Sequence, residues 1–142
     1  MIIKFKNKNY ILNYVENNFG YPKNILSFNE TKYIEIFPLE DYLKDNKKYV
    51  KYYRIFRPKK YLNNNSIFNF LKSLDMKKLK FSYFNFIYKN NDTYNCLSFI
   101  LKILNYLNII SNFDINTIFP NDFIKLPELS NNLYNNPFIM KV

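Results

Sequence analysis

The sequence predicts an α+β fold in which an antiparallel β-sheet packs against a central cysteine-bearing helix and a second helix. Three observations support this class. Short runs of β-branched and aromatic residues fill the first part of the chain, an amphipathic pattern follows at 66–74, and a strongly apolar segment begins at the only cysteine, Cys96. The chain has 142 residues, of which 48% are hydrophobic. We therefore predict one domain over 1–142, with a loosely structured tail from about 124 to 142.

Five segments carry the strand prediction. Each is rich in isoleucine, valine, tyrosine or phenylalanine, and turn residues such as Gly20 and Pro22 separate them. The apolar spacing over 9–19 also fits one face of a helix, although the residue types favour a strand. Residues 80–88 are expected to be extended or irregular. The predicted strands are 2–5, 10–15, 25–28, 33–37 and 47–56.

Two helices outside the cysteine segment are predicted from their first residues. Pro38 is expected at a first helical position, where proline is tolerated, and Glu40 and Asp41 favour the positive end of the helix dipole. Ser66 is the predicted N-cap of the amphipathic helix that ends near 74. A short final element is expected over 119–123.

The cysteine segment is predicted to be a buried helix. Asn95 is a good N-cap, which would place Cys96 at the first helical position, where unpaired N–H groups and the helix dipole stabilise a thiolate. Apolar residues cover most of the circumference over 97–110, as in a helix held between layers. A free cysteine is more often a small core residue than a nucleophile, so both roles stay open for Cys96.

The net charge of +10 raises the question of nucleic acid. The densest basic stretch runs from Lys47 to Lys60, and aromatic residues interleave with its cations. The heavy use of Asn, Lys, Ile, Phe and Tyr is typical of an A/T-rich genome, which explains both features without a ligand. Nucleic acid binding through Lys47–Lys60 is therefore a possible but not a favoured prediction.

Several classes of site are disfavoured by composition. One cysteine cannot form an intramolecular disulfide, the absence of histidine removes the commonest metal ligand and general base, and one glycine cannot build a phosphate-binding loop. We predict no cofactor and no metal. The apolar run 97–110 is shorter than the roughly 20 residues that span a bilayer, and Lys4 and Lys6 interrupt any signal peptide. An intracellular, reducing location is expected.

The cysteine motif resembles that of a known superfamily. The segment Tyr94-Asn95-Cys96-Leu97-Ser98-Phe99, followed by an apolar helix and by the Phe-Pro-Asn-Asp-Phe motif over 119–123, is similar to the circularly permuted papain-like proteins. These include NlpC-type hydrolases, lecithin:retinol acyltransferase-like enzymes and versions in large DNA viruses. Residues 34–43 resemble the strand and Pro-Leu segment of that family, and 25–28 resemble the preceding strand. The resemblance implies strands first and the cysteine helix late, which is the order predicted above.

The resemblance also implies a departure from the family's chemistry. In the family, a histidine on an early strand takes the thiol proton and a polar group on the next strand orients it. This chain has no histidine. The resemblance of the early strand places Tyr10 or Ile11 at the histidine position, and Ser27 or Glu30 near the orienting position. Cys96 remains the candidate nucleophile, but loss of the base would cost on the order of 10²–10⁴-fold in rate.

Two functional expectations follow. The first is a catalytically impaired or inactive papain-like domain of a large DNA virus, acting by binding a protein or a lipid or acyl ligand near Cys96. The second is a basic structural or RNA-contacting subunit of ribosomal or respiratory-complex type, encoded by an A/T-rich organellar genome.

Overall fold

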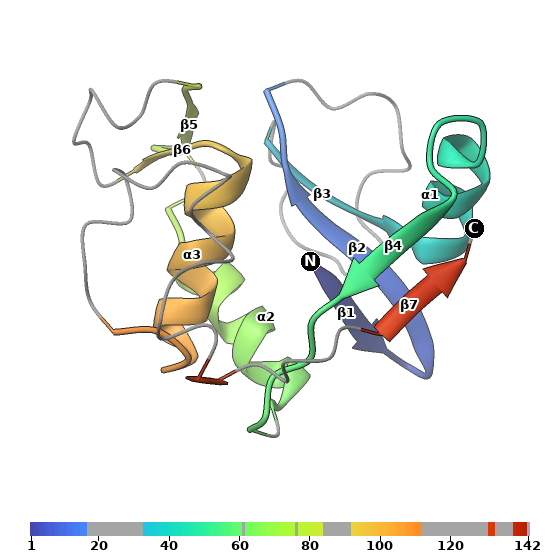
Figure 1. Cartoon of the computed structure of the whole chain (residues 1–142). Coiled ribbons are helices and arrows are strands. Elements are labelled where there is room, and N and C mark those ends of the chain that lie inside the picture. Colours follow the sequence, from blue (N-terminus) through green and yellow to red (C-terminus); the bar gives the residue numbers. More distant parts are fainter. Residues whose placement is uncertain are drawn as a thin grey trace.

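The fold is of the α+β class, as predicted. The computed structural model describes residues 1–16, 33–60, 62–75, 77–83, 92–111, 131–132 and 138–141. Within these residues, helices are interspersed among strands that pair mainly antiparallel (Figure 1). The strand predicted over 25–28, the turn at Gly20 and the element predicted over 119–123 lie outside the described residues.

A three-stranded antiparallel sheet forms the first layer. Its strands are β1 (Ile2–Phe5), β2 (Lys8–Tyr14) and β3 (Ile34–Pro38), paired in the order β1-β2-β3. Lys6 and Asn7 join β1 to β2, and both have positive φ, 45° and 63°, which suits a two-residue hairpin turn. The strand prediction for this part of the chain is confirmed, with shifts of one or two residues at some ends.

The two helices α2 (Asn64–Ser73) and α3 (Cys96–Tyr106) cover one face of the sheet. Strand β2 alternates, so that Tyr10, Leu12 and Tyr14 all point into this side and are buried. Helix α2 packs against β1, α3 packs against β2, and the helices pack on each other. The predicted arrangement of a sheet against the cysteine helix and a second helix is therefore present.

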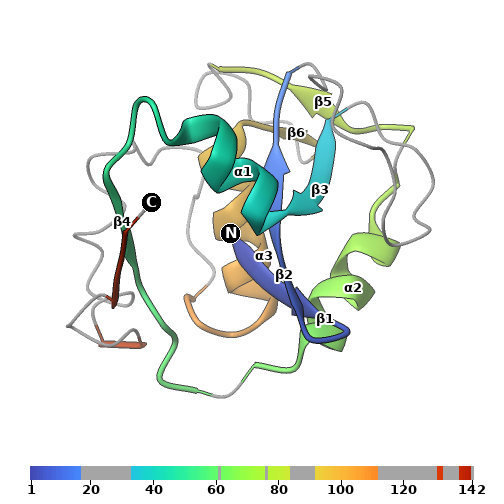
Figure 2. The same ribbon diagram turned by 90° about the vertical axis from the view of Figure 1, so that its right-hand side faces the viewer.

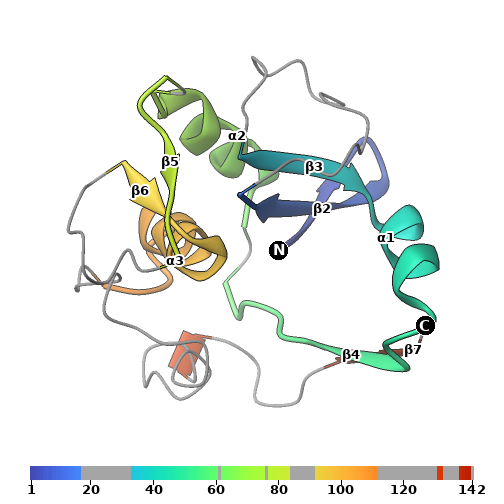
Figure 3. The same cartoon turned by 90° about the horizontal axis from the view of Figure 1, so that it is seen from above.

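A two-stranded ribbon lies on the other side of the sheet from α2. Strand β4 (Tyr52–Ile55) pairs antiparallel with β7 (Phe138–Lys141), and Figures 2 and 3 both show the three-stranded sheet between this pair and α2. Helix α1 (Leu39–Asn46) packs on β2 and β3. The Tyr42 ring lies 5.9 Å from Phe37 of β3 and 5.8 Å from Tyr53 of β4, measured between ring centroids. An aromatic row therefore links sheet, helix and ribbon.

This ribbon corrects two predictions. The strand predicted over 47–56 is limited to β4, because the N–H groups of Tyr49 and Val50 both donate to the Asn46 carbonyl and hold 47–49 in a turn. The tail predicted to be loosely structured contains β7, whose backbone is paired with β4. A partner so distant in the sequence supplies the hydrogen bonds that make these last residues a strand.

Both predicted helix starts also shift. Pro38 ends β3 and stands at the N-cap position of α1 without a side-chain capping hydrogen bond, so the helix begins at Leu39. Asn63, and not Ser66, caps α2, because its Oδ1 accepts the Asn65 N–H at 2.9 Å. The amide side chain lies three residues earlier than the predicted hydroxyl cap, so the helix gains residues at its start.

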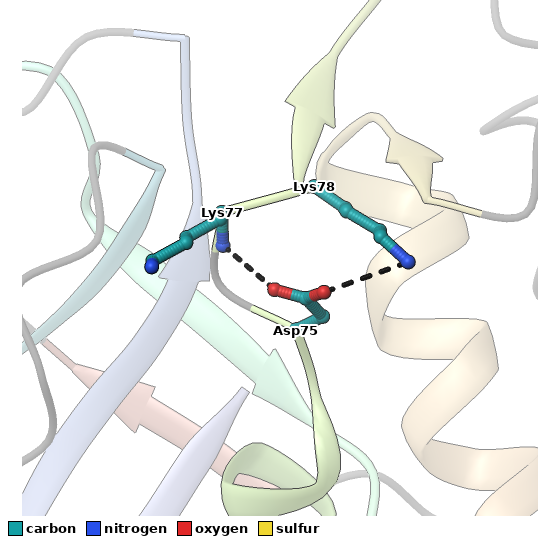
Figure 4. Close-up of polar contacts among 3 residues, drawn as sticks. All are labelled: Asp75, Lys77 and Lys78. Carbon is teal, nitrogen blue, oxygen red and sulfur yellow. Dashed lines mark hydrogen bonds and ion pairs between the residues drawn. The ribbon is translucent and has the colours of Figure 1, made fainter.

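The chain turns sharply between α2 and β5 (Lys80–Phe81). Asp75 accepts the backbone N–H of Lys77 at 3.2 Å and pairs with the Lys78 ammonium at 3.6 Å (Figure 4). Both partners of the ion pair are largely exposed, so it contributes at most about 1 kcal/mol. Strand β5 then pairs in parallel with β6 (Thr93–Tyr94), which leads directly into α3. Of the extended segment predicted over 80–88, residues 80–81 are a strand, and 84–88 lie outside the described residues.

Candidate functional site

The start of α3 is held by a complete capping box. The Asn95 side chain accepts the N–H groups of Leu97 and Ser98, at 3.0 and 2.9 Å. In return the Ser98 hydroxyl accepts the Asn95 N–H at 2.9 Å. The predicted N-cap at Asn95 is confirmed, and Cys96 is the first residue of the helix. Its side chain is exposed to solvent, which excludes the buried-core role for this cysteine.

The C-terminal end of α3 is also capped. Asn108 has a left-handed φ of 56°, its N–H donates to the Asn105 carbonyl, and the Ile109 N–H donates to the Leu104 carbonyl. This is the bond pattern of a Schellman motif, in which two otherwise unpaired carbonyls are satisfied. Leu104 and Ile109 are both buried. The helix that carries Cys96 is therefore fixed at both ends and along its apolar side.

A cluster of aromatic rings lies beside the start of α3, with Tyr14 of β2 at its centre. The Tyr14 ring is fully buried and stacks on Phe99 with centroids 4.6 Å apart. Tyr94 lies edge-on to both of these rings, at 5.8 Å from each. Phe81 of β5 also stacks on Tyr14, with the ring centroids 5.9 Å apart. The Tyr14 hydroxyl donates to the Lys80 carbonyl at 2.8 Å, so its proton is held by the backbone.

The structure brings Tyr14 of β2 to the cysteine helix, where its ring stacks on Phe99. Tyr10 is buried on the same face of β2, opposite Ile3 and Pro38. It stands four residues before Tyr14, which is roughly 13 Å along a strand. Among the described residues, no hydrogen bond joins the Tyr10 hydroxyl to the Cys96 sulfur. The period-two alternation of β2 places both tyrosines on one face, so it marks Tyr14 as a candidate but does not choose between the two.

Ser27 and Glu30 lie outside the described residues. Within the described part of the chain, no group of three His, Cys, Asp or Glu side chains could hold a metal ion. The described part also contains no helix that is long and apolar enough to cross a membrane.

The chemistry available at this site is limited by the state of Tyr14. A general base must accept a proton near neutral pH, whereas Tyr14 donates its own proton to a carbonyl. Burial raises the pKa of Tyr14 well above the ordinary tyrosine value, and Tyr33, Tyr94 and Asp92 raise it further. Burial, followed by Asp92, also raises the pKa of Tyr94. The aromatic cluster around Tyr14 is therefore neutral and apolar near neutral pH.

A second tyrosine of high pKa joins the ribbon to α1. The Tyr53 hydroxyl oxygen is shielded from solvent and has no hydrogen-bond partner among the described residues. Burial and, to a smaller extent, the adjoining Tyr42 raise the pKa of Tyr53 to about 12. Both Tyr14 and Tyr53 are therefore stabilised in the neutral form by folding.

Stability is expected to fall in alkali. In the unfolded chain these tyrosines ionise near pH 10, and in the folded protein they ionise at higher pH. At these two tyrosines the folded state then binds more protons between about pH 10 and 12, so their contribution to stability is complete below this window and decreases through it. Urea midpoints at about pH 9 and about pH 11 measure the effect. Tyr14→Phe is the control, because it should reduce the decrease; equal midpoints for the native protein would contradict the prediction.

The basic stretch from Lys47 to Lys60 surrounds β4. Its seven cations stand on the turn before this strand, on the strand itself and on the residues after it, and all of their side chains are exposed. The stretch contains no acidic residue. The cations are Lys47, Lys48, Lys51, Arg54, Arg57, Lys59 and Lys60.

Comparisons with known proteins found no match, whether among protein-family models, curated proteins or solved structures. The papain-like resemblance of the cysteine motif therefore stays a prediction.

Proposed function

We propose that this protein is a non-catalytic binding domain with the strand and helix order of the permuted papain-like superfamily. The observation that carries the proposal is Tyr14, a buried tyrosine that donates its proton to the backbone beside the helix of the exposed Cys96. The arrangement keeps a well-capped helix with a thiol at its first position. It offers no imidazole, because the chain has no histidine.

The lack of a base in contact with Cys96 among the described residues separates binding from catalysis. Thiol-dependent acyl transfer needs a group that removes the thiol proton and later protonates the leaving group. A tyrosine whose neutral form is stabilised by burial does neither near neutral pH. The exposed Cys96 side chain, next to the apolar residues of α3, remains suited to contact with a protein or an acyl ligand.

The test is multiple turnover of an activated ester. We expect p-nitrophenyl acetate to be hydrolysed no faster by the native protein than by Cys96→Ala. The rates are compared after more than one ester molecule per chain has been hydrolysed. Because Cys96 is exposed, the alanine variant should keep its thermal midpoint, which verifies the fold. Repeated turnover that disappears in Cys96→Ala would overturn the proposal.

A basic RNA-contacting subunit is the second candidate function, and one observation favours it. The seven cations of the stretch from Lys47 to Lys60 are all exposed around one ribbon, together with exposed aromatic rings. A cluster of this kind attracts phosphate.

A further inference from the structure

The two faces of the β4–β7 ribbon have different roles. In the register of the pair, Tyr52 is opposite Lys141 and Arg54 is opposite Ile139, and all four side chains are exposed. The alternate residue Tyr53 points toward α1, where its ring contacts Tyr42. One face therefore anchors the ribbon. The other, which we call the outer face (Tyr52, Arg54, Ile139 and Lys141), meets solvent.

The outer face and its surroundings carry positive charge without compensation. Arg54 and Lys141 stand on the face itself, and six further cations flank β4 in the stretch from Lys47 to Lys60. In the described part of the chain, no ion pair joins any of these eight cations to a carboxylate. Their charge is available to a polyanion, whose binding would release counterions.

Aromatic rings stand among these cations and are open to solvent. The side chains of Tyr49 and Tyr52 are 84% and 55% exposed, and Phe138 at the end of the ribbon is 51% exposed. The Arg57 guanidinium lies 5.2 Å from the centre of the Phe138 ring, so this cation and this ring are adjacent at the end of the ribbon, where Phe138 pairs with Ile55 on the face of Tyr53. Rings interleaved with cations match a ligand that alternates flat bases with phosphates.

We propose that the outer face of the β4–β7 ribbon, with the flanking cations, binds single-stranded nucleic acid. This inference deepens the second candidate function, on which it rests, by naming the surface and the class of nucleic acid. Bases can stack on exposed rings only when they are unpaired, which favours a single strand over a duplex. An anionic membrane is the less suitable polyanion, because interfacial elements separate an apolar side from a charged side, whereas the outer face mixes the two.

The binding test uses the full chain and a fluorescently labelled oligouridylate, with anisotropy as the readout. We expect binding that weakens steeply between about 50 and 200 mM salt. Arg54→Ala combined with Lys141→Ala should make the slope of log affinity against log salt shallower by about 1.4, because each neutralised phosphate of a single strand contributes about 0.7. Tyr52→Ala should weaken binding by about tenfold, and Tyr52→Phe should not.

A matched control removes the same charge elsewhere. Lys4 on β1 and Lys77 after α2 are exposed and lie outside the ribbon, so the double alanine variant at these two positions should keep most of the salt slope. If the control pair reduced the salt slope as much as the Arg54 and Lys141 pair does, the attraction would be diffuse and the proposal would be overturned. Binding of a duplex as tightly as the single strand would also overturn it. Preferential binding of vesicles with anionic lipid through Arg54 and Lys141 would also overturn it. Thermal midpoints verify folding of each variant.

These outcomes are separable from those for Cys96. Absence of oligouridylate binding would remove this inference and leave the non-catalytic assignment standing. Cys96-dependent ester turnover would remove the non-catalytic assignment, and the salt slopes would still report on the outer face.

Discussion

Replacing Tyr14 with alanine is expected to lower the free energy of unfolding by about 3–5 kcal/mol. The ring is fully buried, and it contacts rings of β5, β6 and α3, so its removal leaves a cavity where several elements meet. Since small domains have only about 5–15 kcal/mol of stability, this is a large fraction of the total. The shift of the urea midpoint, with the slope of the transition, measures it.

Tyr14→Phe is the matched variant for this prediction. It keeps the ring and removes the hydrogen bond from the hydroxyl to the Lys80 carbonyl, which should cost about 1 kcal/mol. The difference between the two variants separates packing from hydrogen bonding. Equal costs for Phe and Ala would mean that the ring contacts contribute nothing, contrary to the fold described above.

Phe37→Ala is expected to cost about 3–5 kcal/mol and to loosen the ribbon. Phe37 is buried on β3, and its ring contacts Tyr42, which in turn contacts Tyr53 of β4. An isolated pair of strands is only marginally stable in water, so the β4–β7 ribbon depends on this row of rings. Amide hydrogen exchange should rise in β4 and β7 more than in β1 and β2.

The control for Phe37 keeps the volume close to the original. Phe37→Leu should cost less than Phe37→Ala, because it leaves a smaller cavity, and should preserve most of the protection of β4 and β7. Unchanged exchange in the ribbon of the alanine variant would contradict the anchoring role of the row.

Much of the fold could be predicted from local patterns. The strand over 2–5 and the N-cap at Asn95 were predictable because alternation and capping involve residues only a few positions apart. The α2 cap was predicted at Ser66 and is found at Asn63, since two good capping residues lie within one turn and local sequence alone does not choose between them. Errors of this kind concern boundaries and leave the class of fold unchanged.

The candidate site was only partly predictable. Cys96 at the exposed start of a capped helix follows from the local sequence. The tyrosine beside that helix does not, because Tyr10 and Tyr14 share one face of β2 and the choice between them depends on where the helix crosses the strand. The sequence predicted Tyr10 at the site, and the ring contact described with α3 is made by Tyr14.

By itself, the sequence determined the α+β class, the main sheet strands in the described residues, the capped cysteine helix and the excess of positive charge. The tertiary structure decided that Tyr14 meets Phe99 and that β7 pairs with β4, which turns a basic stretch into an exposed face with rings and cations together. The physical reason is the sequence distance over which each kind of interaction acts. Alternation and capping act within a few residues, whereas strand pairing and ring packing join segments far apart in the chain, and only their burial in a common fold selects the partners.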